Sequence, residues 1–210
     1  MKHYLIKFVS EEDHADQFIK GALFSRPAIY YHDQEKKLQP AQRDEQEAIV
    51  FANLMLYKNY DRPVFCMYMV PEEDVDTSTI RFPARLPKEF NAKYAVIVEF
   101  EAFIERLSHI KDNQYAVLAG PVKYGVPTYE LSAQLLLDGK PNNLLIKPSS
   151  YRYQNEYRVI VCEKVAEDFK IYHLSESLQG VAKKVKIEDL ESIDGYYTTN
   201  IVEGIESSGK

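Results

Sequence analysis

The chain has 210 residues, and 45% of them are hydrophobic, so it is long enough to bury a sizeable core. Its content of Gly, Pro and charged residues is ordinary, which excludes the disordered, collagen-like and low-complexity classes. The formal net charge of −6 argues against binding nucleic acid through the whole surface, but it does not exclude binding through a local basic cleft.

The N-terminal 25 residues carry several charges and leave no apolar region for a signal peptide. The apolar runs are far shorter than the roughly 20 residues that cross a bilayer. Cys66 and Cys162 each lie in a β-like apolar run, as buried thiols do in a reducing compartment. We therefore expect a cytoplasmic protein with no membrane span, no disulfide and no metal.

The first predicted elements are a strand over residues 3–9 and a helix over residues 11–20 that stops at Gly21. An extended segment follows, and the polar residues 30–43 predict a surface loop or lid. Acidic residues near Asp44 and an apolar stripe after them predict a second helix.

Strands are then predicted over residues 63–70 and 93–100, with an irregular segment over 71–90 between them. A short helix is expected over residues 101–110. The remaining elements are extended pieces near 115–125 and 128–130, a helix over 131–140, strands over 157–163 and 169–174, and a mixed segment over 183–193.

Strands and helices of uneven length predict the α+β class. We expect a single domain over residues 1–203, with a split central, mainly antiparallel sheet and flanking short helices. Residues 204–210 are small and polar, and we expect them to be a frayed tail.

The segment over residues 147–161 carries the most chemical information. Gln154, Glu156 and Arg158 alternate at its centre, so on a strand their side chains would form one polar row on one face. Such a row at the entrance of an apolar strand is usual for a cleft. The alternative is an ion pair on a solvated face, with the neighbouring tyrosines as ordinary strand aromatics.

Short motifs lie at residues 4–8, 19–26, 44–47, 63–66 and 147–158, in that order. With these motifs, the chain resembles the bacterial family called domain of unknown function 2971 across roughly residues 3–165. That family is similar to one found in mobile elements and abortive-infection settings. Where the family often has Glu, this chain has Gln154, and residues 30–33 replace an Asn-Asp-Pro turn that the family often carries.

Gln154-Asn155-Glu156 also resembles the Gln-x-Glu element of ADP-ribosyltransferases. This resemblance implies that Glu156 stabilises the ribosyl cation as nicotinamide leaves, while Gln154 orients the acceptor. It implies an ADP-ribosyltransferase-like fold, NAD as the substrate, and an acceptor that is a protein or a nucleic acid.

The same resemblance assigns a set of residues to the nicotinamide nucleotide. Lys7 stands where that superfamily has His or Arg; it meets phosphate as a point charge but cannot form a forked contact. Lys7 and Arg26 would hold the pyrophosphate, and a tyrosine would stack on the nicotinamide. The candidate cofactor-binding residues are Lys7, Ser25, Arg26, Tyr30, Tyr31, Tyr153 and Arg158, around a cleft roofed by residues 30–43.

The leading expectation is an NAD-dependent ADP-ribosyltransferase or NAD-glycohydrolase-like toxin or defence protein of a bacterium, phage or mobile element. Two alternatives stay open. One is a non-catalytic module that recognises a phage protein, a nucleotide or nucleic acid through tyrosines. The other is a metal-dependent nuclease, with hard oxygen ligands from Asp33, Glu35, Asp44, Glu45 and Glu47. In that alternative, Glu156 and Arg158 would resemble the acid-x-base end of a restriction-type site, with Arg in the usual place of Lys.

Overall fold

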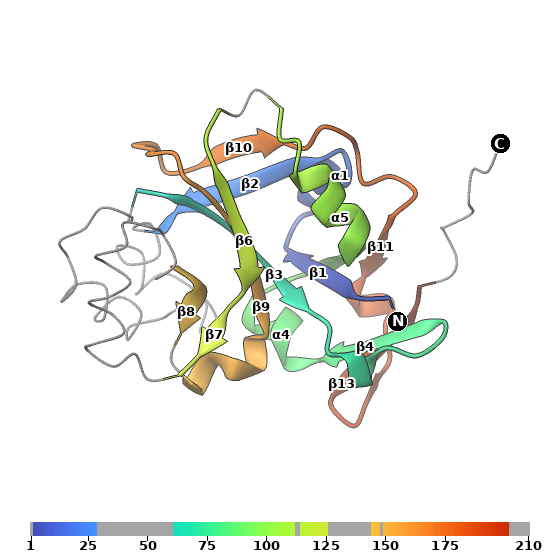
Figure 1. Ribbon diagram of the computed structural model, residues 1–210. Coiled ribbons are helices and arrows are strands. Elements are labelled where there is room, and N and C mark those ends of the chain that lie inside the picture. The colour runs from blue at the N-terminus through green and yellow to red at the C-terminus, as the bar shows by residue number, and fades with distance from the viewer. Residues whose placement is uncertain (1, 29–60, 112–113, 126–143, 148, 202–210) are drawn as a thin grey trace. The chain divides into compact units, whose positions relative to one another are not determined.

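The computed structural model describes residues 2–28, 61–111, 114–125, 144–147 and 149–201 (Figure 1). The chain divides into two compact units, each described by itself. Unit 1 comprises Met1–Leu23, Met67–Asn113 and Tyr172–Lys210, and unit 2 comprises Phe24–Cys66 and Gln114–Ile171. No described helix is long and apolar enough to cross a membrane.

The secondary structure confirms the α+β class, because the described strands pair mostly antiparallel and the described helices are short. The prediction of a single domain over residues 1–203 depends on how the two units are placed, and it stays a prediction.

Strand β5 (Tyr94–Glu99) is the centre of unit 1. It pairs antiparallel with β1 (Tyr4–Val9) on one side and with β11 (Ala182–Lys186) on the other. The end of β3 (Pro63–Met69) pairs with β1 in turn. Four consecutive buried residues, from Ala95 to Val98, give β5 apolar side chains on both faces, as a central strand covered on both sides requires.

Helices α1 (Glu12–Ile19) and α5 (Phe100–Leu107) both contact β5, and they lie close together in Figure 1. The rings of Phe18 and Phe103 join them, with centroids 6.3 Å apart. Both helices confirm the predicted ones within three residues at each end. Gly21 follows α1 with a φ of +95°, a left-handed conformation that glycine adopts without strain.

The segment over residues 71–90 is more regular than predicted. It contains a 3-10 turn, η2 (Glu72–Asp74), then β4 (Thr79–Pro83) and α4 (Arg85–Glu89). The prediction of an irregular segment is wrong because Ile80 and Phe82 alternate with exposed or half-buried residues and are fully buried.

A small sheet with the order β12-β13-β4 completes unit 1. Its strands β12 (Ser192–Ile193) and β13 (Tyr196–Asn200) follow the 3-10 turn η5 (Ile187–Asp189). β13 was not expected from the sequence, because four of its five side chains are exposed or half-buried and give no clear apolar alternation.

Unit 2 is built around β9 (Glu156–Val161), whose six residues are all buried. β9 pairs antiparallel with β6 (Val117–Pro121) and also pairs with β3. β3 pairs with β2 (Ala22–Pro27), which lies next to β10 (Lys170–His173). Val64, Leu144 and Ile160 form a buried apolar cluster, and Leu118 packs against it.

Two short strands and a 3-10 helix place the polar residues of unit 2. β7 (Lys123–Tyr124) and β8 (Ile146–Lys147) pair in parallel, and η4 (Ser149–Gln154) leads into β9. Several predictions lie outside the described residues: the loop over 30–43, the helix near Asp44, the strand near 128–130, the helix over 131–140 and the tail over 204–210.

Candidate functional site

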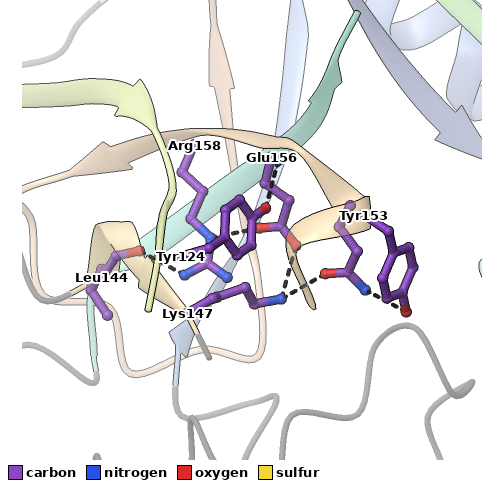
Figure 2. A network of polar contacts seen from close by, with 7 residues as sticks. Tyr124, Leu144, Lys147, Tyr153, Glu156 and Arg158 are labelled. Carbon is purple, nitrogen blue, oxygen red and sulfur yellow. Dashed lines mark hydrogen bonds and ion pairs between the residues drawn. The ribbon is translucent and has the colours of Figure 1, made fainter. Parts of the chain in front are cut away.

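Three segments of unit 2 bring polar side chains together in one buried cluster (Figure 2). Parallel pairing of β7 and β8 sets Tyr124 opposite Lys147. The third segment runs from η4 into β9 and supplies Gln154, Glu156 and Arg158. We call Lys147, Gln154, Glu156 and Arg158 the buried polar cluster, since 1% to 8% of the surface of each is exposed.

Lys147 is the centre of this cluster. Its ammonium Nζ donates to the side-chain oxygen Oε1 of Gln154 and to Oε1 of Glu156, each at 2.9 Å. The same Nζ lies 5.0 Å from the centroid of the Tyr151 ring, within the range of a cation–π contact. The ammonium therefore faces a carboxylate, an amide oxygen and an aromatic ring.

Arg158 holds the other oxygen of the carboxylate. Its Nε donates to Oε2 of Glu156 at 2.8 Å, and its Nη1 donates to the backbone oxygen of Leu144 at 2.6 Å. The planar guanidinium thereby ties the start of β9 to the residues just before β8. A lysine could not make both contacts in this fixed geometry.

Tyr124 approaches Glu156 from the backbone side. The Tyr124 hydroxyl accepts a hydrogen bond from the Glu156 N–H at 2.8 Å, as the dashed line in Figure 2 shows. Burial, followed by the nearby Glu156 charge, raises the pKa of Tyr124 well above its usual range. The phenol is therefore neutral at pH 7.

The carboxyl of Glu156 is ionised in spite of its burial. Burial alone would raise its pKa, but the charges of Arg158 and Lys147 and their hydrogen bonds outweigh that effect and lower the pKa to about 2. A buried ionised carboxylate stabilises positive charge, and in this structure two protein cations supply that charge.

The local chain path corrects the predicted polar row. Gln154 is the last residue of η4 and does not belong to the strand, so it does not share a strand face with Glu156. Asn155 between them has a φ of +36°, which turns the chain from the 3-10 helix into β9. Gln154 and Glu156 meet instead through the ammonium of Lys147.

The alternative of an ion pair on a solvated face is also wrong. Glu156 and Arg158 do form an ion pair, but the pair is buried, because only 8% of the Glu156 surface and 5% of the Arg158 surface are exposed. In this setting the loss of Glu156 would leave two buried cations without its counter-charge, which costs far more than breaking a surface pair.

The other predicted site residues fall in several places. Tyr153 is half-buried, and its hydroxyl lies 3.5 Å from Nε2 of Gln154. Ser25 and Arg26 lie on β2; Ser25 is buried, and the guanidinium carbon of Arg26 lies 5.2 Å from the Phe24 ring centroid. Their strand pairs with β3, to which β9 also pairs.

Lys7 belongs to β1 of unit 1, where it is opposite Val96. Tyr30 and Tyr31 lie outside the described residues, as do the five acidic residues of the nuclease alternative between Asp33 and Glu47. Within the described ranges, no three His, Cys, Asp or Glu side chains are grouped so that they could hold a metal ion.

Sequence reasoning missed the roles of Lys147 and Tyr124. Lys147 is the first residue of the segment over 147–161, but it precedes Glu156 by nine residues. The alternation of side chains along a strand therefore does not place the two residues on one face. Tyr124 reaches the site through a parallel pair of two-residue strands. These strands are too short to show a periodic pattern, and they pair with a segment distant in the sequence. The sequence therefore gives no local signal that brings these residues together.

Comparisons with protein-family models, with curated proteins and with solved structures gave no match to this chain. Its function is therefore argued from the buried polar cluster.

Proposed function

We propose that the chain cleaves the bond between nicotinamide and ribose in NAD, with Glu156 as the carboxylate that stabilises the ribosyl cation. The observation that carries this proposal is the shared contact of Gln154 and Glu156 with one positive charge, the Lys147 ammonium, at 2.9 Å each. A site that holds one cation between an ionised carboxylate and an amide oxygen has the electrostatics that a developing cation needs.

In the proposed step, the bond from the ribose C1′ to the nicotinamide nitrogen breaks. The electron pair stays on the leaving nicotinamide, which becomes neutral, and positive charge develops at the ribose. Water or the oxygen of an acceptor then attacks C1′ and loses its proton to solvent. Glu156 stabilises the charge on the sugar more strongly in the transition state than in the ground state.

The cations around Glu156 have separate roles in this proposal. Arg158 keeps the carboxylate ionised and oriented by donating from Nε to Oε2, while its Nη1 donates to the backbone oxygen of Leu144. Lys147 occupies Oε1, so the substrate takes the place of its ammonium on that oxygen. Gln154, which shares the contact with Lys147, orients the acceptor.

The remaining site residues and the wider identity belong to the same proposal. Ser25, Arg26 and Tyr153, all of unit 2, would contact the nucleotide. The proposal also includes an ADP-ribosyltransferase-like fold and membership of the family of domain of unknown function 2971. The biological role that we propose is defence or toxicity.

The test is to incubate the purified full chain with NAD and to follow nicotinamide and ADP-ribose by chromatography. The proposal expects both products to appear in proportion to the protein. Gln154→Ala should still release ADP-ribose to water but lose transfer to a protein or nucleic-acid acceptor. Glu89→Gln, which breaks the exposed pair with Arg85, is a matched control that should keep both activities.

A second candidate function is the binding of a nucleotide without chemistry. It is favoured by the contacts that fill both carboxylate oxygens of Glu156 with buried protein cations. In that case NAD should raise the melting temperature in a saturable way, with no nicotinamide in the solution. Absence of both the shift and the product would contradict both candidates.

A further inference from the structure

Three acceptors of positive charge surround the ammonium of Lys147. They are the ionised carboxylate of Glu156, the amide oxygen of Gln154 and the ring of Tyr151, with Nζ at 2.9 Å, 2.9 Å and 5.0 Å. We call these three side chains the cation cage. All three come from one continuous stretch of six residues, η4 and the start of β9.

The occupant of the cage comes from a different element. Lys147 is the last residue of β8 and reaches the cage along a flexible four-carbon stem. Figure 2 shows this stem extended toward Glu156, with the ammonium at its tip. The cage and its occupant thus come from different elements of the chain. The lysine contacts the cage through its ammonium group.

We infer that the cation cage is a binding site for an organic monocation and that Lys147 is its internal ligand. Arg158 pairs with Oε2 of Glu156, and the other buried carboxylate oxygen, Oε1, favours a second positive charge, while the aromatic ring prefers a cation to a neutral group of the same shape. Primary ammonium and other small organic cations meet both requirements. A neutral or anionic ligand meets neither.

This inference deepens the proposed function, on which it rests only for the identity of the natural ligand. Oxidised NAD carries a positive charge on its nicotinamide ring, whereas the reduced form has a neutral ring. The cage therefore favours the oxidised form, and the Lys147 ammonium competes with it for the same acceptors. The following test of the cage uses no NAD, so its outcome is independent of NAD cleavage.

The test is chemical rescue of Lys147→Ala. This substitution removes three methylene groups and the ammonium, which together are the heavy atoms of propylammonium. The variant should melt about 10 °C below the wild type, because a buried ion pair is broken. Propylammonium chloride, up to about 100 mM, should restore much of this loss in a saturable way, since it binds only the folded chain.

Two solutes and one variant serve as controls. Sodium chloride at equal ionic strength tests for a salt effect, and 1-propanol tests for simple filling of the space by a neutral molecule of the same shape. Neither should rescue Lys147→Ala. Lys147→Met fills the space beside the cage with an uncharged side chain and should not respond to propylammonium.

Equal effects of propylammonium and 1-propanol on Lys147→Ala, or no effect of either, would overturn the inference. Where the variant does not fold alone, the measurement is its refolding yield in propylammonium, and failure to refold there also overturns it. Rescue by propylammonium in a chain that neither binds nor cleaves NAD would support the cage and contradict the proposed function.

Discussion

Tyr124 and Lys147 are partners across the parallel strands β7 and β8, and both reach Glu156. The Tyr124 hydroxyl accepts the backbone N–H of Glu156, while the Lys147 ammonium donates to its carboxylate. This short pair of strands therefore holds both the backbone and the carboxylate of Glu156, while Arg158 of β9 holds the second carboxylate oxygen. Loss of the pairing between β7 and β8 would therefore disturb two of the contacts that hold Glu156.

The first prediction concerns the hydroxyl of Tyr124. Tyr124→Phe removes the partner of the Glu156 N–H and leaves a buried donor unsatisfied, which should cost about 1–3 kcal/mol of unfolding free energy. Urea denaturation measures this loss. Tyr94→Phe is the matched control, because its hydroxyl makes only a long exposed contact with Glu12, and it should cost less than about 0.5 kcal/mol. Equal losses would contradict the role given to Tyr124.

The second prediction concerns the shape of the Arg158 side chain. Arg158→Lys keeps the charge but cannot contact both Glu156 and the Leu144 oxygen, so it should lower the unfolding free energy by about 2 kcal/mol. The same measurement on Arg85→Lys, in an exposed pair with Glu89, should show a change under about 0.5 kcal/mol. A neutral Arg158→Lys would show that charge alone suffices at this position.

The third prediction concerns the left-handed residue between Gln154 and Glu156. Asn155→Gly and Asn155→Ala both remove the polar side chain, but only glycine adopts a φ of +36° without strain. The alanine variant should therefore be less stable than the glycine variant by about 1 kcal/mol. Thermal or urea unfolding of the pair measures this difference. An alanine variant as stable as the glycine variant would contradict a conformational constraint at Asn155.

The fourth prediction concerns acid. Because the pKa of Glu156 is about 2 in the folded chain and 4.5 as its ordinary value, its ionisation stabilises the fold fully above pH 4.5. This contribution, about 3 kcal/mol, is lost as the pH falls from 4.5 through 2. Glu156→Gln lacks it, so the gap in stability between wild type and variant should be wide at pH 7 and narrow near pH 2. A gap that stays constant with pH would contradict the buried ion pairs.

Much of the fold could be predicted from the sequence where the signal is periodic. The helix after β1 and the buried run of β5 follow from apolar spacing and from the glycine at position 21. β13 could not be predicted, since its polar side chains show no pattern and its pairing with β4 is long-range.

The candidate site was predicted in part for a similar reason. Glu156 and Arg158 share a strand face, so their pairing follows from alternation along β9. The alternation rule placed Gln154 on that face as well and failed, because it assumes a strand on both sides of Asn155. Lys147 and Tyr124 depend on tertiary pairing between elements of two residues each, for which the sequence offers no local rule.

The most direct test of the central claim is the rate of nicotinamide release from oxidised NAD by wild type and by Glu156→Asp. Aspartate keeps the charge but withdraws the carboxylate by one methylene, so circular dichroism and the melting temperature first establish that the variant is folded. The account predicts release by the wild type and a rate at least about 100-fold lower in the folded variant. No release by the wild type, or equal rates in both proteins, would contradict it.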